Sequence, residues 1–366
     1  MASGRRQPSS QVRRASVVGA GSFGTAVALL IERAGVRTTL LCRTEEQARA
    51  LIEARENKRY LPGVELPAAL KVRAFGARDD QFRRPDLVFL AVPSKGLGEA
   101  IAEIERLGVS PQAGMVSLAK GLVPPDGTPP TTALERAFGA ERTACVGGPA
   151  HAREMVEAGA GLVCASHSEE LAMRVSELFQ RAGVVCEASN DPVGVELAGV
   201  AKNAAAVAVG ATQSQGLNAA GMAAADIFLE VLSLAELWGG SARTFVGRGG
   251  TGDLVATTLA PTSRNRSAGE LLAAGTPAAE IPARLGQTVE ALETVRLLAR
   301  AIERAGLDAP VTSALSRLIA GDLPLDDWIA LVRAKQPPPA RFARPRTWWV
   351  RMRDWFAGRR TATAPR

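Results

Sequence analysis

Short apolar runs alternate with helical patterns over the first half of the chain. The runs that we expect to form strands are residues 16–18, 38–41, 87–92, 115–118, 143–146, 161–164 and 184–186. Because most of them are apolar at successive positions, they are typical of a parallel sheet that is buried on both faces. Their alternation with helices predicts an α/β fold with a Rossmann-type doubly wound sheet.

Beyond Asp191 the apolar positions follow helical spacing, with few strand signals between them. The expected helices are residues 193–211, 220–238, 278–284, 289–305 and 310–319. An all-α C-terminal domain should therefore follow the sheet, as a chain of 366 residues exceeds the usual size of one core. The expected parts are a disordered basic arm (1–14), a sheet domain (15–190), an all-helical domain (191–335) and a tail (336–366).

The net charge of +7 lies in the two ends of the chain. Residues 1–14 carry a charge of +4 and residues 336–366 carry +7, so the remaining body carries −4. A mildly acidic body is a poor match for nucleic acid, and we expect no nucleic-acid partner.

The four cysteines form no CxxC pair, and only two histidines are available to join them in a metal site. We therefore expect no metal. Each cysteine lies in or beside an apolar stretch, which indicates buried free thiols and a reducing, cytoplasmic compartment.

A glycine-rich turn follows the first expected strand and opens the first expected helix. Its residues Gly19, Gly21 and Gly24 fit the GxGxxG pattern of a dinucleotide site. Gly19 would permit the tight turn, Gly21 the approach of a pyrophosphate, and Gly24 close packing of helix on strand. The helix N-terminus would then face the anion.

The end of the second expected strand bears on the choice of cofactor. A site for NAD usually has an acidic residue there, whereas this chain has Arg43, followed by Glu45 and Glu46. Arg43 can pair with the 2′-phosphate of NADP, so NADP is favoured over NAD. The alternative is a solvated arginine on a loop.

Lys202 stands alone among apolar residues on the first helix of the second domain. Helical spacing places Glu196, Gly199 and Asn203 near it on one side. A partly desolvated lysine has a lowered pKa and suits proton transfer near neutral pH. The alternatives are a lysine that extends out of an interdomain groove, or one that pairs with Glu196 for structural reasons.

A second glycine-rich turn, residues 249–252, leads into Asp253, and Ser263-Arg-Asn-Arg follows after a short interval. The hydroxyl, guanidinium and amide groups of the latter suit a phosphate. The alternative is a helix cap at Thr262 or Ser263, with the arginines in solvent.

Together these segments resemble bacterial-type NAD(P)-dependent glycerol-3-phosphate dehydrogenase from about residue 16 to residue 335. The segments that carry the resemblance are GAGSFGTA from Gly19, AVPS from Ala91, AKGL from Ala119, GGPAHAREM from Gly147, GVELAGVAKN from Gly194, GGTGDL from Gly249 and SRNR from Ser263. Their order and spacing are far more specific than any one of them.

The resemblance implies interconversion of dihydroxyacetone phosphate and sn-glycerol 3-phosphate with NAD(P), for glycerophospholipid synthesis, by a homodimer. It implies that Lys202 is the general acid/base, that Asp253 binds the hydroxyl end of the substrate and steadies Lys202, and that Lys120 touches substrate and cofactor. The other implied substrate residues are Gly148, Ala150, Ser263, Arg264 and Asn265. The implied cofactor residues are Gly19, Gly21, Ser22, Phe23, Gly24, Arg43, Lys120, Gly148, Ala152, Arg264 and Glu290.

The chain departs from the family at three places. Ala150 stands where the family usually has a hydroxyl residue, His151 stands where it has an aromatic one, and residues 214–218 replace an Asp-Gly-Leu-Gly stretch. Losing one substrate hydrogen bond would cost about 0.5–1.5 kcal/mol. We expect His151 to fill the aromatic position. The departures keep open a related 2- or 3-hydroxyacid dehydrogenase, or a weakly active nucleotide-binding paralogue.

The tail begins with a Pro-rich spacer at residues 337–339 and continues with aromatic residues at helical spacing: Trp348, Trp349, Met352, Trp355 and Phe356. A basic helix of this kind could contact an anionic membrane surface through residues 348–356. The favoured alternative is that the aromatic residues pack on the protein's own body or on a dimer partner.

Overall fold

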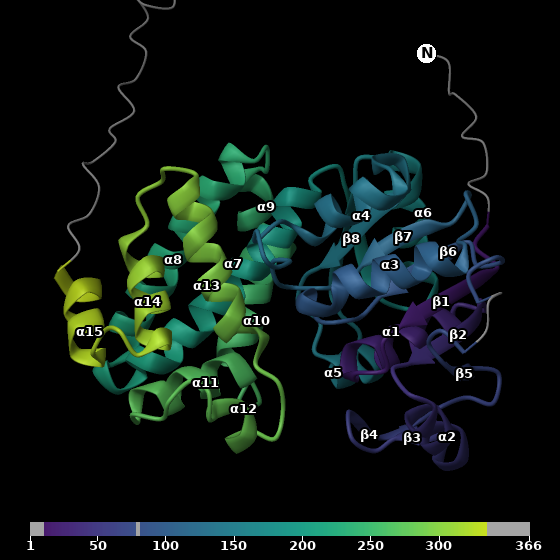
Figure 1. The fold of residues 1–366 in the computed structure, drawn as a ribbon, viewed down its shortest axis with the longest axis horizontal. Coiled ribbons are helices and arrows are strands. Elements are labelled where there is room, and N and C mark those ends of the chain that lie inside the picture. Colours follow the sequence, from purple (N-terminus) through teal and green to yellow (C-terminus); the bar gives the residue numbers. More distant parts are fainter. Residues whose placement is uncertain (1–10, 78–80, 335–366) are drawn as a thin grey trace, which may run out of the picture. The chain divides into compact units, whose positions relative to one another are not determined.

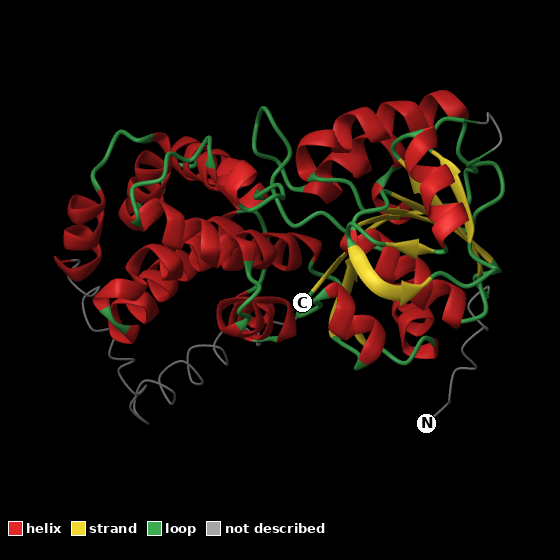
Figure 2. Ribbon diagram, turned by 90° about the horizontal axis from the view of Figure 1, so that it is seen from below, coloured by secondary structure: helices red, strands yellow, loops and turns green. Residues whose placement is uncertain are grey.

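The computed structural model describes residues 11–77 and 81–334, and the described residues up to Arg333 form one compact unit. All the described strands lie in a sheet lobe, residues 12–189, and helices alone make up a helical lobe, residues 192–334 (Figures 1 and 2). The predicted Rossmann-type sheet followed by an all-α part is confirmed.

The described strands are β1 (Arg14–Val18), β2 (Arg37–Cys42), β3 (Glu56–Asn57), β4 (Leu61–Glu65), β5 (Lys71–Ala74), β6 (Leu87–Leu90), β7 (Gly114–Ser117), β8 (Thr143–Gly147), β9 (Gly161–Ser166) and β10 (Val185–Ser189). The helices of the sheet lobe are α1 (Ser22–Arg33), α2 (Glu45–Ala54), η1 (Ser94–Gly96), α3 (Leu97–Leu107), α4 (Pro130–Phe138), η2 (Ala140–Arg142), α5 (Ala152–Glu157) and α6 (Glu169–Arg181). Those of the helical lobe are α7 (Pro192–Thr212), η3 (Gln213–Gln215), α8 (Leu217–Leu237), α9 (Ala242–Val246), η4 (Arg248–Gly252), α10 (Asp253–Leu259), α11 (Arg264–Ala273), α12 (Ile281–Arg284), α13 (Glu290–Arg304), α14 (Pro310–Ala320) and α15 (Leu325–Ala334).

The main sheet has eight strands in the order β10-β9-β8-β7-β6-β1-β2-β5. Every predicted strand is present in it. The edge strand β5 was not predicted, because its sequence, Lys-Val-Arg-Ala, alternates charged and apolar residues instead of forming an apolar run. The short hairpin β3–β4 was not predicted either.

One strand pair departs from the expected parallel arrangement. β8 and β9 are antiparallel, whereas the other pairs of the main sheet are parallel. Between them lies α5, a helix of 6 residues that packs against α1. A helix this short spans roughly 9 Å, too little to return the chain along the sheet for a parallel crossover.

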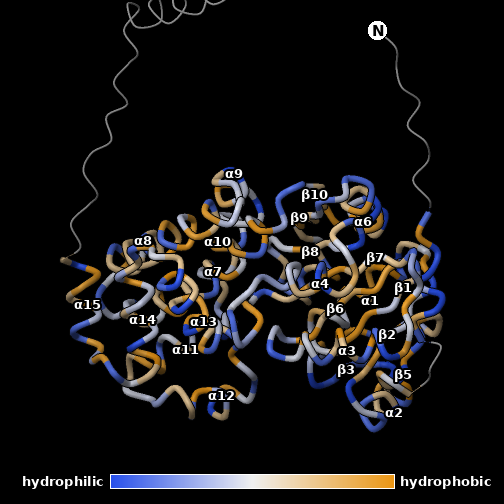
Figure 3. The backbone as a smooth tube through the Cα atoms, turned by 45° about the horizontal axis from the view of Figure 1, so that its top comes forward, coloured by the Kyte–Doolittle hydropathy of each residue, from blue (hydrophilic) through white to orange (hydrophobic). Residues whose placement is uncertain are grey.

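The central strands are mostly apolar, as the hydrophobic colour in the middle of the sheet shows in Figure 3, and β6 is apolar at every position. β6 and β7 are buried at every position. Burial on both faces explains why these strands have continuous apolar sequences rather than alternating ones.

The chain joins the sheet lobe just before β1. Val12 is buried, and the backbone N–H groups of Arg13 and Arg14 both donate to the carboxylate of Asp86. The fold therefore begins earlier than the predicted end of the basic arm at Arg14. The rest of that arm, residues 1–10, and the predicted aromatic helix at 348–356 lie outside the described residues.

Two of the described helices are long and apolar enough to cross a membrane by length and composition. For the first, residues 192–215, 89% of the most apolar window is buried inside the fold, which marks α7 as a core helix. For the second, α8, the buried share is 44%. The four cysteines are free and buried, as predicted.

A buried glutamate holds α8 and α14 together. The carboxylate of Glu230, on α8, accepts hydrogen bonds from the backbone N–H groups of Val311 and Thr312 at 3.1 and 2.8 Å, and from the Thr312 hydroxyl at 2.7 Å. These groups lie in the first turn of α14, where N–H groups have no partner within the helix. Glu230 therefore caps α14 from a neighbouring helix.

Replacing Glu230 by Ala is expected to lower the free energy of unfolding by on the order of 3 kcal/mol, because buried donors left without an acceptor each cost about 1–3 kcal/mol. Glu230→Gln keeps one acceptor oxygen and should cost less. Urea unfolding followed by circular dichroism measures both variants. Glu99→Ala, at an exposed position on α3, serves as the control, and equal midpoints for Glu230→Ala and Glu99→Ala would show that the cap is unimportant.

Candidate active site

The glycine-rich turn between β1 and α1 has room on one side only. Gly19 has a φ of +108°, and a Cβ on it would lie 2.6 Å from the carbonyl oxygen of Ala91. A Cβ on Gly24 would lie 2.0 Å from the carbonyl oxygen of Gly19. At Gly21, by contrast, a Cβ would meet no described atom within 4 Å. The open space therefore lies beside Gly21.

That space adjoins the N-terminus of α1. Gly21 is the N-cap of this helix. Because glycine has no side chain, no cap side chain accepts from the first N–H groups of α1. Uncapped N–H groups and the helix dipole attract a phosphate. The turn thus fits the pyrophosphate of a dinucleotide, the cofactor that its sequence predicts.

The turn opens into a cleft of about 2130 Å³, lined by residues of both lobes. The cleft brings together most of the site residues that the sequence predicts: Gly19, Gly21, Ser22, Phe23, Gly24, Arg43, Lys120, Ala152, Lys202, Ser263, Arg264, Asn265 and Glu290. Gly148, Ala150 and Asp253 are not among the residues that line it. Gly148 and Asp253 contact Lys120 instead, and Ala150 packs against the core of the sheet lobe.

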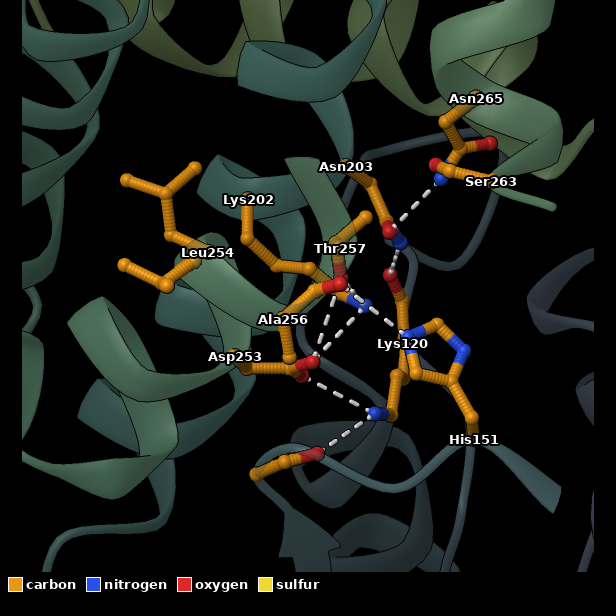
Figure 4. Close-up of polar contacts among 12 residues, drawn as sticks. Lys120, His151, Lys202, Asn203, Asp253, Leu254, Ala256, Thr257, Ser263 and Asn265 are labelled. Carbon is orange, nitrogen blue, oxygen red and sulfur yellow. Dashed lines mark hydrogen bonds and ion pairs between the residues drawn. The ribbon is translucent and has the colours of Figure 1, made fainter. Parts of the chain in front are cut away.

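A buried carboxylate joins the two lysines of the site (Figure 4). One oxygen of Asp253 lies 3.0 Å from Nζ of Lys120, and the other lies 3.1 Å from Nζ of Lys202. Lys120 comes from the loop after β7, Lys202 from α7 and Asp253 from the start of α10. Three separate segments therefore meet at one ionic cluster.

The turn η4 sets the position of Asp253. A Cβ on Gly250 would lie 2.1 Å from the carbonyl oxygen of Phe245, so the chain can fold back this tightly only where a side chain is absent. η4 then leads directly into α10, whose first residue is Asp253.

Burial and charge shift the acid–base behaviour of the cluster. Desolvation, together with the nearby positive charge of Lys120, lowers the pKa of Lys202 to about 8, although Asp253 acts in the opposite direction. For Asp253, burial opposes ionisation, but Lys120 and Lys202 together hold its pKa below the ordinary value. The cluster therefore holds an ionised carboxylate beside an amine that can lose its proton near neutral pH.

Lys202 has a second partner that the sequence did not reveal. Its Nζ donates to the hydroxyl of Thr257 at 2.9 Å, and that hydroxyl lies 3.4 Å from an oxygen of Asp253. Thr257 is one helical turn after Asp253 on α10. Recognising residues 253–259 as a helix would have placed both side chains on one face.

Lys202 does not pair with Glu196, the structural alternative that the sequence allowed. The carboxylate of Glu196 accepts hydrogen bonds from the N–H and hydroxyl of Thr131, at the start of α4, at 2.9 and 2.6 Å. Desolvation raises the pKa of Glu196 to about 8. Glu196 thus ties α7 to the sheet lobe.

Asn203 connects the lysine cluster to the Ser263-Arg264-Asn265 turn. Its amide donates to the carbonyl oxygen of Lys120 at 3.0 Å, and its side-chain oxygen accepts from the amide of Asn265 at 2.8 Å. The sequence placed Asn203 near Lys202 without assigning it a partner. A short chain of hydrogen bonds therefore fixes Asn265 relative to Lys120.

Close packing of α11 on α7 fixes the same turn from the other side. A Cβ on Gly210 of α7 would lie 2.0 Å from the carbonyl oxygen of Arg266, and one on Gly269 of α11 would lie 2.0 Å from that of Val207. The N-cap of α11 is Ser263, whose hydroxyl oxygen accepts from the N–H of Arg266. Ser263 is thus a helix cap as well as part of the cleft wall.

Glu290, the first residue of α13, accepts two hydrogen bonds from the other side of the cleft. One of its carboxylate oxygens accepts from the backbone N–H of Ser94 at 2.8 Å and from the Ser94 hydroxyl at 2.7 Å. Ser94 was not predicted as a site residue. Arg264, also on the helical lobe, donates to the carbonyl oxygen of Thr288 at 3.3 Å.

The loop between β8 and α5 also links the lobes. The carbonyl oxygen of Gly148 accepts from Nζ of Lys120 at 3.0 Å, and Nε2 of His151 lies 3.3 Å from the carbonyl oxygen of Ala256 on α10. The His151 ring therefore lies beside the lysine cluster and makes a polar contact with the helical lobe (Figure 4).

Basic side chains from the segments that follow β2 and β3 line the cleft. Arg43 is exposed there, and its backbone N–H donates to the side chain of Gln47. Lys58 and Arg59, which follow β3, line the same cleft and were not predicted.

Family models match both lobes. The model described as the N-terminus of NAD-dependent glycerol-3-phosphate dehydrogenase matches residues 14–172, and the model of its C-terminus matches residues 191–330.

Individual relatives match over nearly their whole length. The glycerol-3-phosphate dehydrogenase [NAD(P)+] of a Parafrankia species is 34% identical over 333 residues, which is 90% of this chain and 99% of the relative. The protein of the same name from Thermus thermophilus is 36% identical, over 83% of this chain and 93% of the relative.

A crystal structure of glycerol-3-phosphate dehydrogenase from Coxiella burnetii has a TM-score of 0.82 and 25% identity, and the match covers 88% of this chain and 99% of that one. The structure of glycerol-3-phosphate dehydrogenase from Saccharomyces cerevisiae has a TM-score of 0.72 at 20% identity. The match covers 88% of this chain and 99% of that one, so the two share the fold. With both lobes matched in order and the lysine cluster in the cleft between them, the chain belongs to the family of NAD-dependent glycerol-3-phosphate dehydrogenases.

Proposed function

We propose how this chain carries out the reaction of its family, the NAD(P)-dependent interconversion of dihydroxyacetone phosphate and sn-glycerol 3-phosphate. The proposal depends on one observation, the Lys120–Asp253–Lys202 cluster at the cleft. The nicotinamide cofactor, when bound, supplies or accepts the hydride at C2 of the substrate. The chain's own residues then handle the proton, the phosphate and the orientation.

Lys202 is the proposed general acid/base at the C2 oxygen. In reduction, its ammonium form gives a proton to the oxygen as negative charge develops there. In oxidation, its neutral form accepts the hydroxyl proton. Burial and Lys120 lower the pKa of Lys202 to about 8, so both forms are available near neutral pH.

Asp253 and Lys120 are proposed to position and charge-balance this amine. Asp253 and the Thr257 hydroxyl each hold Nζ of Lys202, at 3.1 and 2.9 Å, which leaves one of its three N–H donors for the substrate. Lys120, bound to Asp253 and Gly148, faces the same space, and its Nζ lies 5.5 Å from the ring centre of Phe23 on the glycine-rich side. A preorganised set of donors lowers the barrier without reorganising during the reaction.

The turn of Ser263, Arg264 and Asn265 is proposed to bind the substrate's phosphate. These residues offer hydroxyl, guanidinium and amide donors at the start of α11, whose N-terminus also favours an anion. Holding the phosphate there would orient C2 toward Lys202, since Asn203 ties Asn265 to the backbone of Lys120.

NADP is the proposed preferred cofactor. Arg43 stands where an NAD site would have an acidic residue, and Lys58 and Arg59 line the same cleft. A 2′-phosphate would find guanidinium and ammonium donors there.

The other candidate functions receive less support. If Lys202 were remote from the glycine-rich turn, a non-catalytic role would be favoured. Instead, Lys202 and the turn line the same cleft. A different hydroxyacid substrate would bring no phosphate for the N-terminus of α11 and the Ser263–Asn265 turn to bind. The buried thiols are consistent with a cytoplasmic location, which stays a prediction, as does the homodimer.

Lys202→Ala is expected to lower kcat/KM by about 100-fold or more, the usual contribution of a general acid/base. The assay follows the oxidation of NADH and of NADPH by dihydroxyacetone phosphate at 340 nm. Lys71→Ala, at an exposed position on the edge strand, is the matched control. Absence of turnover by the parent with either cofactor would contradict the function, and a Lys202→Ala enzyme as fast as the parent would contradict the role of Lys202.

The pH profile should follow the pKa of Lys202. We expect kcat/KM for reduction to fall as pH rises through about 8, because the ammonium form is lost, and kcat/KM for oxidation to rise through the same range. Asp253→Asn should move both midpoints to lower pH, since the carboxylate raises the pKa of Lys202. Steady-state kinetics in both directions between pH 6 and 10 test this, and flat profiles would refute it.

Arg43→Ala is expected to weaken NADPH binding by about 10-fold relative to NADH, because a charge-assisted hydrogen bond contributes roughly 1.5–3 kcal/mol. The measurement is the ratio of KM values for the two cofactors, with exposed Arg37→Ala as the control. An unchanged ratio in Arg43→Ala would contradict the assignment.

A further inference from the structure

His151 lines the cleft beside the lysine cluster but takes no part in the proposed proton transfer. It is the N-cap residue of α5, yet its side chain makes no capping hydrogen bond, so the imidazole is not engaged with its own helix. The preceding Ala150 has no polar side chain and packs against the core of the sheet lobe. His151 is therefore the residue of the 147–151 loop that brings a polar side chain to the cleft.

The loop that carries His151 is held firmly against β9. Gly148 has a φ of +107°, and a Cβ on it would lie 2.4 Å from the carbonyl oxygen of Gly161. The backbone N–H of Gly161 donates in turn to the carbonyl oxygen of Pro149. Because the carbonyl oxygen of Gly148 also accepts from Nζ of Lys120 at 3.0 Å, the loop has a fixed position relative to the lysine cluster.

The imidazole ring of His151 presents one unused acceptor. Its Nε2 lies 3.3 Å from the carbonyl oxygen of Ala256, and a carbonyl oxygen only accepts, so Nε2 carries the hydrogen in this contact. In the neutral ring, Nδ1 then has a lone pair and accepts hydrogen bonds. Nδ1 lies on the side of the ring away from Ala256, where no hydrogen bond joins it to another described residue (Figure 4).

The acceptors of the lysine cluster itself are already engaged. The two oxygens of Asp253 bind the two lysines, and the side chain of Asp253 is only 3% exposed. The hydroxyl of Thr257 accepts from Lys202 and lies 3.4 Å from an oxygen of Asp253. The side-chain oxygen of Asn203 accepts from Asn265. A hydroxyl group that enters beside Lys202 therefore meets amine donors but needs an acceptor from another part of the site.

Dihydroxyacetone phosphate carries such a hydroxyl group on C1. With the C2 oxygen at Lys202 and the phosphate at the Ser263–Asn265 turn, C1 is directed away from that turn. We propose that His151 binds this end of the substrate, with Nδ1 accepting a hydrogen bond from the C1 hydroxyl. The inference rests on the proposed function. It makes His151 a specificity residue for 2-oxo phosphoesters with a hydroxymethyl group, beyond filling an aromatic position.

Hydroxyacetone phosphate tests this contact, because it has a methyl group where dihydroxyacetone phosphate has the C1 hydroxymethyl group. The readout is the ratio of kcat/KM for dihydroxyacetone phosphate to kcat/KM for hydroxyacetone phosphate, with the same reduced cofactor. We expect a ratio of about 10 or more for the parent. His151→Phe keeps an aromatic ring but removes the acceptor, so it should lower this ratio about 10-fold, which corresponds to about 1.4 kcal/mol.

Two further variants separate the lost acceptor from a disturbed structure. His151→Asn is the conservative variant, since its amide oxygen takes the place of Nδ1, and it should keep most of the parent's ratio. His167→Phe is the matched control. His167 is the other histidine of the chain, its side chain is 50% exposed, and it is not among the residues that line the cleft. We expect His167→Phe to have the ratio of the parent.

The outcomes distinguish this inference from the proposed function. A parent that turns over dihydroxyacetone phosphate but accepts hydroxyacetone phosphate equally well would overturn the role of His151, as would a His151→Phe enzyme with the parent's ratio. Loss of the preference in His151→Asn as complete as in His151→Phe would also overturn it, because the acceptor would then be irrelevant. A parent that turns over neither compound would instead contradict the proposed function itself.

Discussion

The active site depends on one buried carboxylate that balances two ammonium groups. The carboxylate oxygens of Asp253 lie 3.0 Å from Nζ of Lys120 and 3.1 Å from Nζ of Lys202. The three residues come from three different segments of the chain. Without Asp253, two positive charges would face each other in a poorly solvated space, which costs far more there than in water. The same carboxylate keeps the pKa of Lys202 from falling further. Asp253 therefore both positions the two lysines and sets the acid–base behaviour of Lys202.

The surrounding fold holds this cluster through α7. The helix carries Lys202 and Asn203, is bound to the sheet lobe through Glu196 and Thr131, and packs against α11 where Gly210 and Gly269 allow backbone contact. The many Ala and Gly residues of α7 allow neighbouring elements to pack closely around it, so the helix is buried. A rigid central helix of this kind suits a site that must hold three segments within hydrogen-bonding distance.

Much of the fold could be predicted from the sequence because buried strands and long helices have clear apolar patterns. The site residues were named from motifs, and the family resemblance paired Asp253 with Lys202, but the other partners were not predicted. Helical spacing placed Lys202 next to Glu196, and only the family resemblance pointed to Asp253. Both Asp253 and the unpredicted partner Thr257 lie on a short helix more than fifty residues away. Short elements such as α10 and β5 carry too few residues for a periodic pattern. Contacts between distant segments depend on packing that no local pattern records.

The central claim is spatial, and a crystal structure with oxidised cofactor and dihydroxyacetone phosphate tests it most directly. The account predicts the C2 oxygen of the substrate within hydrogen-bonding distance, about 3 Å, of Nζ of Lys202, and the phosphate on Ser263, Arg264 and Asn265. A substrate bound with its C2 oxygen turned away from Lys202, or with its phosphate elsewhere in the cleft, would contradict it.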